Sequence, residues 1–402
     1  MSKKRDVFNI KYVFFILTVY FIFIPFFFKI SMDTVLVMLV VLLGCFAFYF
    51  GDSLKSPMLA EQKITSKKIK IFFSFLGGAF FILDIFRVVI NSLSKIEIGN
   101  YTTNFQVSDH ESLYLQIFTV ILDSAKFYFY SQIIFIHRIV FYMVFLLQIF
   151  LYIGATTRLM ALFPIIIFTI YGYYMKYIQI TLPRIFLLLL AAPILFSYGL
   201  LARGNVQASS TFEFYSNVQN SMTSDRFFTL LPVALESFKS FEDLTQIITD
   251  NFIHPESGLI RMIFMPISRT IWPDKPEAIS RLISKEYYPG QYVEGGGSVA
   301  TIFGDAFING HVFGVIVILT ALGFFSKVLY KTLIKKKFLS KRQRSVFFML
   351  YALYSFDFLY FYRGFFSEFL WKTILLITVF FTLHKIQFSS KYVNSKRISR
   401  ER

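Results

Sequence analysis

The sequence has little cysteine, little tryptophan and few acidic side chains. Cys45 is the only cysteine and lies inside an apolar run, so neither an intramolecular disulfide nor a thiolate metal cluster can form. The five histidines are widely separated, and their spacing gives no histidine metal site. There is no Walker-type P-loop, no HExxH and no GxSxG, so the standard ATPase and hydrolase signatures are missing. We expect neither a metal nor a cofactor.

Long apolar runs dominate what is present. Hydrophobic residues make up 56% of the 402 residues, and the mean hydropathy is +0.60. Since a bilayer-spanning helix needs about 20 apolar residues, the sequence predicts an all-α polytopic membrane protein with about ten transmembrane helices. The opening MSKKRDVFNIK lacks a small-residue cleavage site before its apolar run, which predicts a retained signal anchor. The candidate spans are 12–28, 34–50, 70–90, 113–135, 139–153, 159–175, 185–202, 307–325, 345–362 and 367–384.

The basic residues predict the orientation. We expect seven spans in 1–202, a large extracytoplasmic loop at 203–306, three spans in 307–384 and a basic cytoplasmic tail at 385–402. With both termini cytoplasmic, the cytoplasmic segments hold 26 of the 41 Lys and Arg, whereas the loop has eight basic and twelve acidic residues. That asymmetry follows the positive-inside rule and places the chain as a multi-pass protein of a cytoplasmic membrane. The basic clusters are expected to face membrane lipids, not nucleic acid.

The loop is long enough to be functional. Apolar residues at helical spacing between 224 and 252 predict one or two short amphipathic helices, and the Pro-bounded stretch 271–290 predicts another. The GGGS run at 295–298 is interpreted as a flexible hinge or, alternatively, as a phosphate cradle. The spacing of Gly310 and Gly314 favours a helix-packing notch.

Charged residues near the apolar spans mostly fall at the extracytoplasmic ends, which indicates a polar pocket opening outward. Three pairs at i,i+3 or i,i+4 can neutralise each other on one helix face: Asp84/Arg87, Asp123/Lys126 and Glu368/Lys372.

Five arginines on the outer side lack such neighbours: Arg158, Arg203, Arg261, Arg269 and Arg363. Guanidinium forks match phosphate oxygens, so we expect the five to hold a pyrophosphate. The alternative is that each extends to the headgroups or pairs with an acidic loop residue. The candidate general bases are Asp305, His311 and Glu256, with Asp305 preferred. Asp305 also fits the N-cap of the re-entering helix, and the two roles are compatible.

Residues 150–370 contain a series of motifs on which a family resemblance rests. GATTRLMALFP, GLLARGN, the R…P…R…W…KP stretch at 261–276, GDAFINGHVFG and FYRGFFSEFL follow one another around a single large outer loop. In this arrangement the chain resembles the Wzy-type repeat-unit polymerases of bacterial O-antigen and capsular polysaccharide.

The resemblance implies a metal-independent, inverting glycosyltransferase in the bacterial cytoplasmic (inner) membrane. Its donor would be a glycan on undecaprenyl pyrophosphate, and its acceptor a second lipid-linked repeat unit; a chain-length regulator would be a further partner. The charge that develops on the departing pyrophosphate suits preorganised cations. Two alternatives remain open, an O-antigen ligase and a lipid-linked oligosaccharide flippase.

Overall fold

The computed structural model describes residues 6–56, 59–61, 67–93, 113–152, 158–180, 236–264, 267, 271–293, 296–334, 341–384 and 386–388. The predicted span 185–202 and two of the five arginines, Arg203 and Arg269, lie outside the described residues. Within them the chain is helical apart from one short ladder, in which β1 (Leu59–Glu61) pairs antiparallel with β2 (Ile386–Phe388). That ladder is a small departure from the all-α expectation.

Two apolar helices open the chain. The first is continuous from Ile10 to Phe28 and comprises α1 (Ile10–Thr18), the π turn η1 (Val19–Phe23) and α2 (Ile24–Phe28). The second, α3 (Met32–Ser53), begins at a capping box, because Ser31 Oγ accepts from Thr34 N at 3.2 Å and Ser31 N donates to Thr34 Oγ1 at 2.7 Å. Such reciprocal bonds satisfy backbone donors that a helix start leaves open.

The other long apolar helices follow the predicted spans closely. They are α4 (Lys67–Leu93), α6 (Leu113–Ile133), α7 (Arg138–Tyr152), α8 (Arg158–Tyr174), α17 (His311–Leu333), α18 (Lys341–Tyr360) and, after the π turn η3 (Phe361–Phe365), α19 (Phe366–His384). In the part of the chain described, four helices are long and apolar enough to cross a membrane: Ile10–Phe28, Met32–Ser53, His311–Leu333 and Lys341–Gly364. The chain is therefore a helical membrane protein; the count of ten spans stays a prediction.

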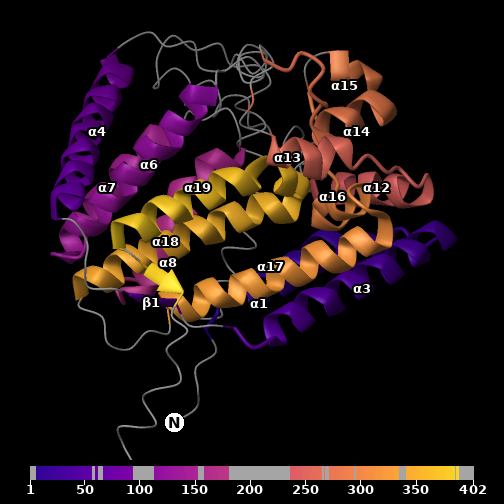
Figure 1. Ribbon diagram of the computed structural model, residues 1–402, viewed down its shortest axis with the longest axis horizontal. Helices are drawn as coiled ribbons and strands as arrows, with labels where there is room; N and C mark the ends of the chain where they lie inside the picture. The colour runs from indigo at the N-terminus through magenta and orange to yellow at the C-terminus, as the bar shows by residue number, and fades with distance from the viewer. Residues whose placement is uncertain are drawn as a thin grey trace, which may run out of the picture.

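Figure 1 shows how the helices are arranged. α3 and α17 lie side by side along one edge, α18 and α19 cross the middle, and α4 and α6 pair on the opposite side. Aromatic rings fill the centre: Phe14 of α1 stacks on Phe48 of α3 at 3.9 Å, and the buried Tyr362 donates to Thr18 Oγ1 at 3.0 Å. The first and last parts of the chain thus share one core.

One face of the bundle joins the segments predicted to be cytoplasmic. Asp6 accepts from Tyr174 at the end of α8 and from Tyr330 near the end of α17, at 3.1 and 2.6 Å. Lys327 Nζ donates to Leu54 O at 2.9 Å, and the β1–β2 ladder ties the end of α3 to the end of α19. These helix ends share one side, as the predicted topology requires; which side is cytoplasmic stays a prediction.

A polar cluster lies inside the bundle. Asp84 of α4 accepts from Tyr130 of α6 at 2.9 Å and from Gln148 of α7 at 3.2 Å, and Lys126 Nζ lies 3.4 Å from its carboxylate. Lys126 also lies 3.8 Å from Asp123, the predicted local partner. The local Asp123/Lys126 pair is confirmed, but the closer ion pair joins two helices. The other two predicted pairs include Arg87 and Glu368, whose side chains lie outside the described residues.

The described part of the loop is compact. It contains α12 (Glu236–Thr249), the π turn η2 (Glu256–Ile260), α13 (Arg261–Ile263), α14 (Ile279–Tyr287), α15 (Pro289–Val293) and α16 (Thr301–Ile308). α12 and α14 confirm the predicted short helices. α12 also packs on α3, and Glu242 forms an ion pair with Lys29 between α2 and α3.

Side chains hold the glycine run in place. Arg281 Nη1 donates to Gly296 O at 3.1 Å, Gln291 Nε2 to Gly297 O at 2.9 Å, and Ser298 Oγ to the buried Asp243 at 2.6 Å. Tyr288 also donates to Asp243, at 2.6 Å. Side chains of α12, α14 and α15 thus bind residues 296–298 from several directions in this conformation. The flexible hinge stays a prediction.

Candidate functional site

The site is built around α16, the short helix that leads into α17. All eight of its residues are buried. α16 ends at Ile308, and α17 begins at His311, whose φ of 56° breaks the helix between them. The predicted span starting at 307 therefore starts four residues too early. Gly314 confirms the packing notch, since a Cβ there would lie 2.3 Å from Ala306 O.

Asp305 binds the turn that follows α16. Its side chain is 1% exposed, and Oδ1 accepts from Asn309 Nδ2 at 2.9 Å. Asn309 Oδ1 in turn accepts from the backbone N–H of Leu259 at 2.6 Å. Asp305 thus orients Asn309, and Asn309 holds the segment that precedes Arg261.

The alternative role expected for Asp305, an N-cap, is wrong. α16 begins at Thr301 with Ala300 as its N-cap, and the N-cap of α17 is Gly310. Asp305 lies in the second turn of an eight-residue helix and caps neither helix start. Its role as a base stays a prediction, and its burial places the carboxylate away from water.

Segment 254–260 packs against the C-terminal end of α16. His254 N donates to Ile308 O at 2.9 Å, and Gly258 lies so close to Asn309 that a Cβ there would be 1.8 Å from Asn309 Oδ1. Only glycine fits this approach without displacing the Asn309 side chain. This contact fixes the position of η2 and α13 relative to α16.

A histidine and a glutamate form a pair at this end of α16. His254 Nδ1 lies 2.9 Å from Glu256 Oε1, with 38% and 50% of the two side chains exposed. The Phe252 ring lies 4.4 Å from the imidazole and supports it. Partial burial alone would raise the pKa of Glu256, but bonds from its own backbone N–H and from His254 outweigh it and lower the pKa. A carboxylate on Nδ1 leaves Nε2 as the proton acceptor.

Arg261 starts α13 and is 9% exposed. Its Nη1 donates to Pro276 O at 3.3 Å, and Lys275 Nζ donates to Ile267 O at 2.9 Å. The Trp272 ring meets Phe264 edge-on at 5.8 Å. The two cations thus fold the 261–276 stretch on itself, which the sequence did not reveal.

Arg363 lies in η3, next to the start of α16. Gly364 has φ 100°, and a Cβ there would lie 3.0 Å from Thr301 O. This close approach keeps the half-buried Arg363 beside α16. α13 packs on α19, which follows η3 directly, so Arg261 lies on an element that contacts the helix after Arg363.

Of the predicted site residues, Asp305 in α16 and Arg363 in η3 lie on elements that pack together. Glu256 in η2 and Arg261 in α13 lie on elements that pack together and on α19. His311 is exposed at the start of α17, with its ring 4.6 Å from Phe307. Arg158 begins α8, but its side chain is outside the description, as are Arg203 and Arg269.

Sequence reasoning missed His254 and Asn309. The histidines were treated as isolated, although His254 and Glu256 are two residues apart, and an asparagine after a buried helix gives no signal by itself. The Leu259–Asn309 bond and the bond from the His254 N–H to Ile308 O join segments about 50 residues apart.

These features define the class as a helical membrane protein in which short helices between residues 236 and 308 pack beside the long apolar helices. Family models, curated proteins and solved structures were compared with the chain, and none of them matches it. Among the described residues, no group of three or more His, Cys, Asp or Glu is placed to hold a metal ion.

Proposed function

We propose that this chain is a repeat-unit polymerase that transfers a glycan from undecaprenyl pyrophosphate to the sugar of a second lipid-linked repeat unit. The observation that carries the proposal is the half-exposed His–Glu pair beside the end of α16, with Arg363 on η3, which packs on α16, and Arg261 on α13, which packs on α19. Elongation needs a base for the acceptor hydroxyl and positive charge for the leaving diphosphate.

In this proposal the base is His254. Glu256 holds its Nδ1, so Nε2 takes the proton as the hydroxyl oxygen attacks the anomeric carbon. The bond from that carbon to the diphosphate oxygen breaks, and the lipid diphosphate leaves with the electron pair. Asp305 is a positioning residue that acts through Asn309.

Arg363 and Arg261 supply positive charge near the leaving group, with Arg158, Arg203 and Arg269 as further predicted contributors. Arg363 is the stronger candidate of the two described side chains, since it is half-buried while Arg261 is almost fully buried and binds a carbonyl of its own loop. Because guanidinium groups carry the charge, chelators should leave elongation unchanged.

The test is elongation by the purified protein in detergent with polyisoprenyl-diphosphate-linked repeat units. A ladder of longer lipid-linked products, unaffected by EDTA, supports the proposal. Transfer only to an added lipid A core acceptor would indicate a ligase, and transbilayer movement without elongation would indicate a flippase.

A further inference from the structure

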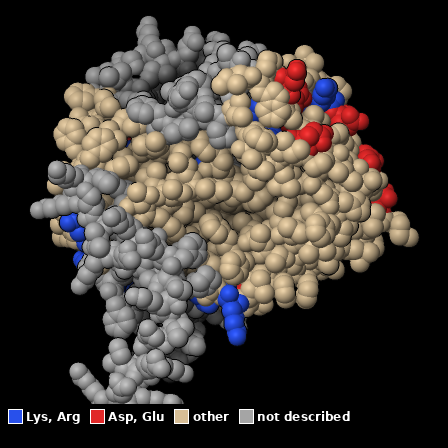
Figure 2. Space-filling view, in the orientation of Figure 1, with Lys and Arg blue, Asp and Glu red and all other residues tan. Residues whose placement is uncertain are grey.

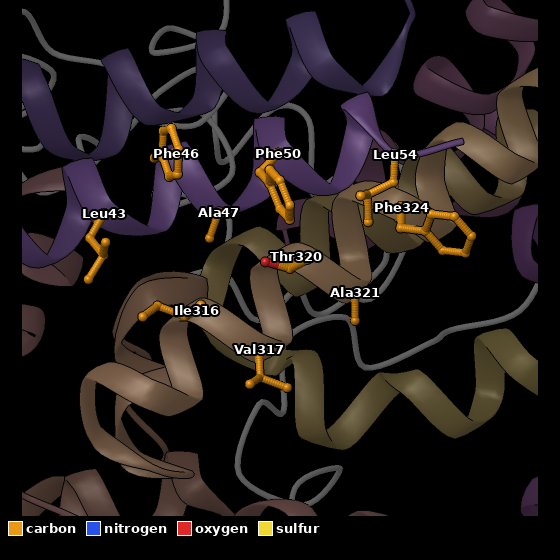
Figure 3. Close-up of a pocket in the computed structure, with 10 residues that line it drawn as sticks. All are labelled: Leu43, Phe46, Ala47, Phe50, Leu54, Ile316, Val317, Thr320, Ala321 and Phe324. Carbon is orange, nitrogen blue, oxygen red and sulfur yellow. The ribbon is translucent and has the colours of Figure 1, made fainter. Parts of the chain in front are cut away.

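An apolar groove runs along the outer edge of α3 and α17. Its volume is about 670 Å³, and α3 contributes Leu43, Phe46, Ala47, Phe50 and Leu54. α17 contributes the other wall, from Ile316 to Phe324. Figure 3 shows these side chains on the two neighbouring helices, with small residues such as Ala47 and Ala321 among larger ones.

Glycines create the groove. A Cβ on Gly51 would lie 2.0 Å from Thr320 O, and a Cβ on Gly323 would lie 2.1 Å from Phe48 O. The two backbones therefore touch, as small residues allow between membrane helices. Because the backbones are so close, Phe46, Phe50 and Val317 remain 70%, 49% and 47% exposed on the flanks.

The groove faces hydrocarbon, because both helices are candidate membrane spans. From Leu43 to Leu54 the chain advances eleven residues, which at 1.5 Å per residue is about 16 Å. That is about half of a hydrocarbon core about 30 Å thick. The length of the groove is therefore close to the thickness of one leaflet, which is the length that a single acyl chain spans.

Positive charge gathers at one end of the groove. Leu54 lines that end, and its carbonyl accepts from Lys327 Nζ at 2.9 Å. Lys55 follows directly and is exposed, Lys331 lies one turn further along α17, and Asp52 is the acidic residue nearby. Figure 2 shows Lys and Arg along the lower and left edges of a broad uncharged surface.

We propose that the groove binds an acyl chain of an anionic phospholipid, with the lipid phosphate at Lys55 and Lys327. The apolar walls accept the chain, the length selects a single leaflet, and the two ammonium groups favour an anionic headgroup. This inference is independent of the proposed polymerase activity.

The experiment uses the full chain in nanodiscs that contain phosphatidylglycerol with a diazirine on the acyl chain. Illumination should label peptides with Phe46, Phe50 and Val317 in preference to the exposed Leu39 and Ile82 outside the groove. One lysine near an anionic headgroup corresponds to about fivefold in affinity, so Lys55→Gln with Lys327→Gln should weaken labelling by about 25-fold. Lys176→Gln, an exposed lysine on the same predicted side, should leave labelling unchanged.

Ala47→Trp and Ala321→Trp fill the groove and should each abolish the label, whereas Leu39→Trp should not. Equal labelling by phosphatidylcholine, equal labelling of Leu39 and Ile82, or cross-linked dimers would overturn the proposal. Displacement of the label by a polyisoprenyl diphosphate would also overturn it. Because Lys327 binds the Leu54 carbonyl, Lys55→Gln is also measured alone; it should weaken labelling about fivefold, and it decides the question even if another variant does not fold.

Discussion

Two polar clusters of this protein use their side chains differently. Between α4, α6 and α7, Asp84, Lys126, Tyr130 and Gln148 bind one another and are at most 8% exposed. Around α16, Asn309 and Arg261 bind backbone groups, and the His254–Glu256 pair stays partly exposed. Charges buried among helices fix which helices pack together, whereas partly exposed groups on a fixed frame can meet a substrate.

The largest loss of stability is expected from a substitution inside the helix bundle. Lys126→Met leaves the Asp84 carboxylate buried without its ammonium partner, which costs about 3–5 kcal/mol of unfolding free energy. The double variant Asp84→Asn with Lys126→Met should recover much of that loss, because both charges are gone. Chemical unfolding in detergent measures the unfolding free energy of each variant and of the unaltered protein. A loss below about 1 kcal/mol for Lys126→Met would show that the pair is not a packing element.

The next largest effect is expected at the contact between Gly258 and Asn309. Gly258→Ala places a methyl group 1.8 Å from Asn309 Oδ1, so the Asn309 side chain or η2 must move and the bond to Leu259 is disturbed, at about 1–3 kcal/mol and with loss of elongation. Gly290→Ala is the matched control, because no atom lies within 4 Å of its Cβ position. Equal behaviour of the two variants would mean that the approach of η2 to α16 is unimportant.

Asp305→Asn sharpens the division of roles around α16. An amide oxygen can still accept from Asn309, so the kcat of elongation should fall by no more than a few-fold if Asp305 only positions. If Asp305 were the base, loss of basicity would lower kcat by about 10²- to 10⁴-fold. Steady-state kinetics of purified protein separate the two outcomes.

The smallest effect concerns Asp243 in α12. Burial raises the pKa of its carboxyl, although bonds from Ser298 and Tyr288 and the nearby Lys239 oppose the shift. A raised folded-state pKa gives stability that is fully present below the ordinary value of 3.8 and is lost as pH rises through the folded-state pKa. Asp243→Asn should therefore flatten the pH dependence of thermal stability above pH 4. An unchanged slope would contradict this.

Hydropathy and helical spacing predicted most of the helices, because burying an apolar run in a membrane depends on local composition. Nine of the ten predicted spans coincide with helices, and the tenth lies outside the described residues. α14 also falls where the Pro-bounded stretch predicts it.

The site was harder to predict, because its contacts join distant segments. No local pattern shows that Asn309 binds Leu259, that Arg281 and Gln291 hold the glycine run, or that Arg261 binds the Pro276 carbonyl. Residue type alone predicted a ligand-binding arginine at 261 and a flexible glycine run. In the fold, Arg261 binds a carbonyl of its own loop, and side chains bind the glycine run.

The most direct test of the account is the elongation rate of His254→Ala against His137→Ala. His137 is an exposed histidine at the start of α7, remote in sequence from α16. Loss of a general base should lower the rate of His254→Ala by about 10²- to 10⁴-fold while His137→Ala matches the unaltered protein. A His254→Ala protein that elongates at the full rate would contradict the proposed site.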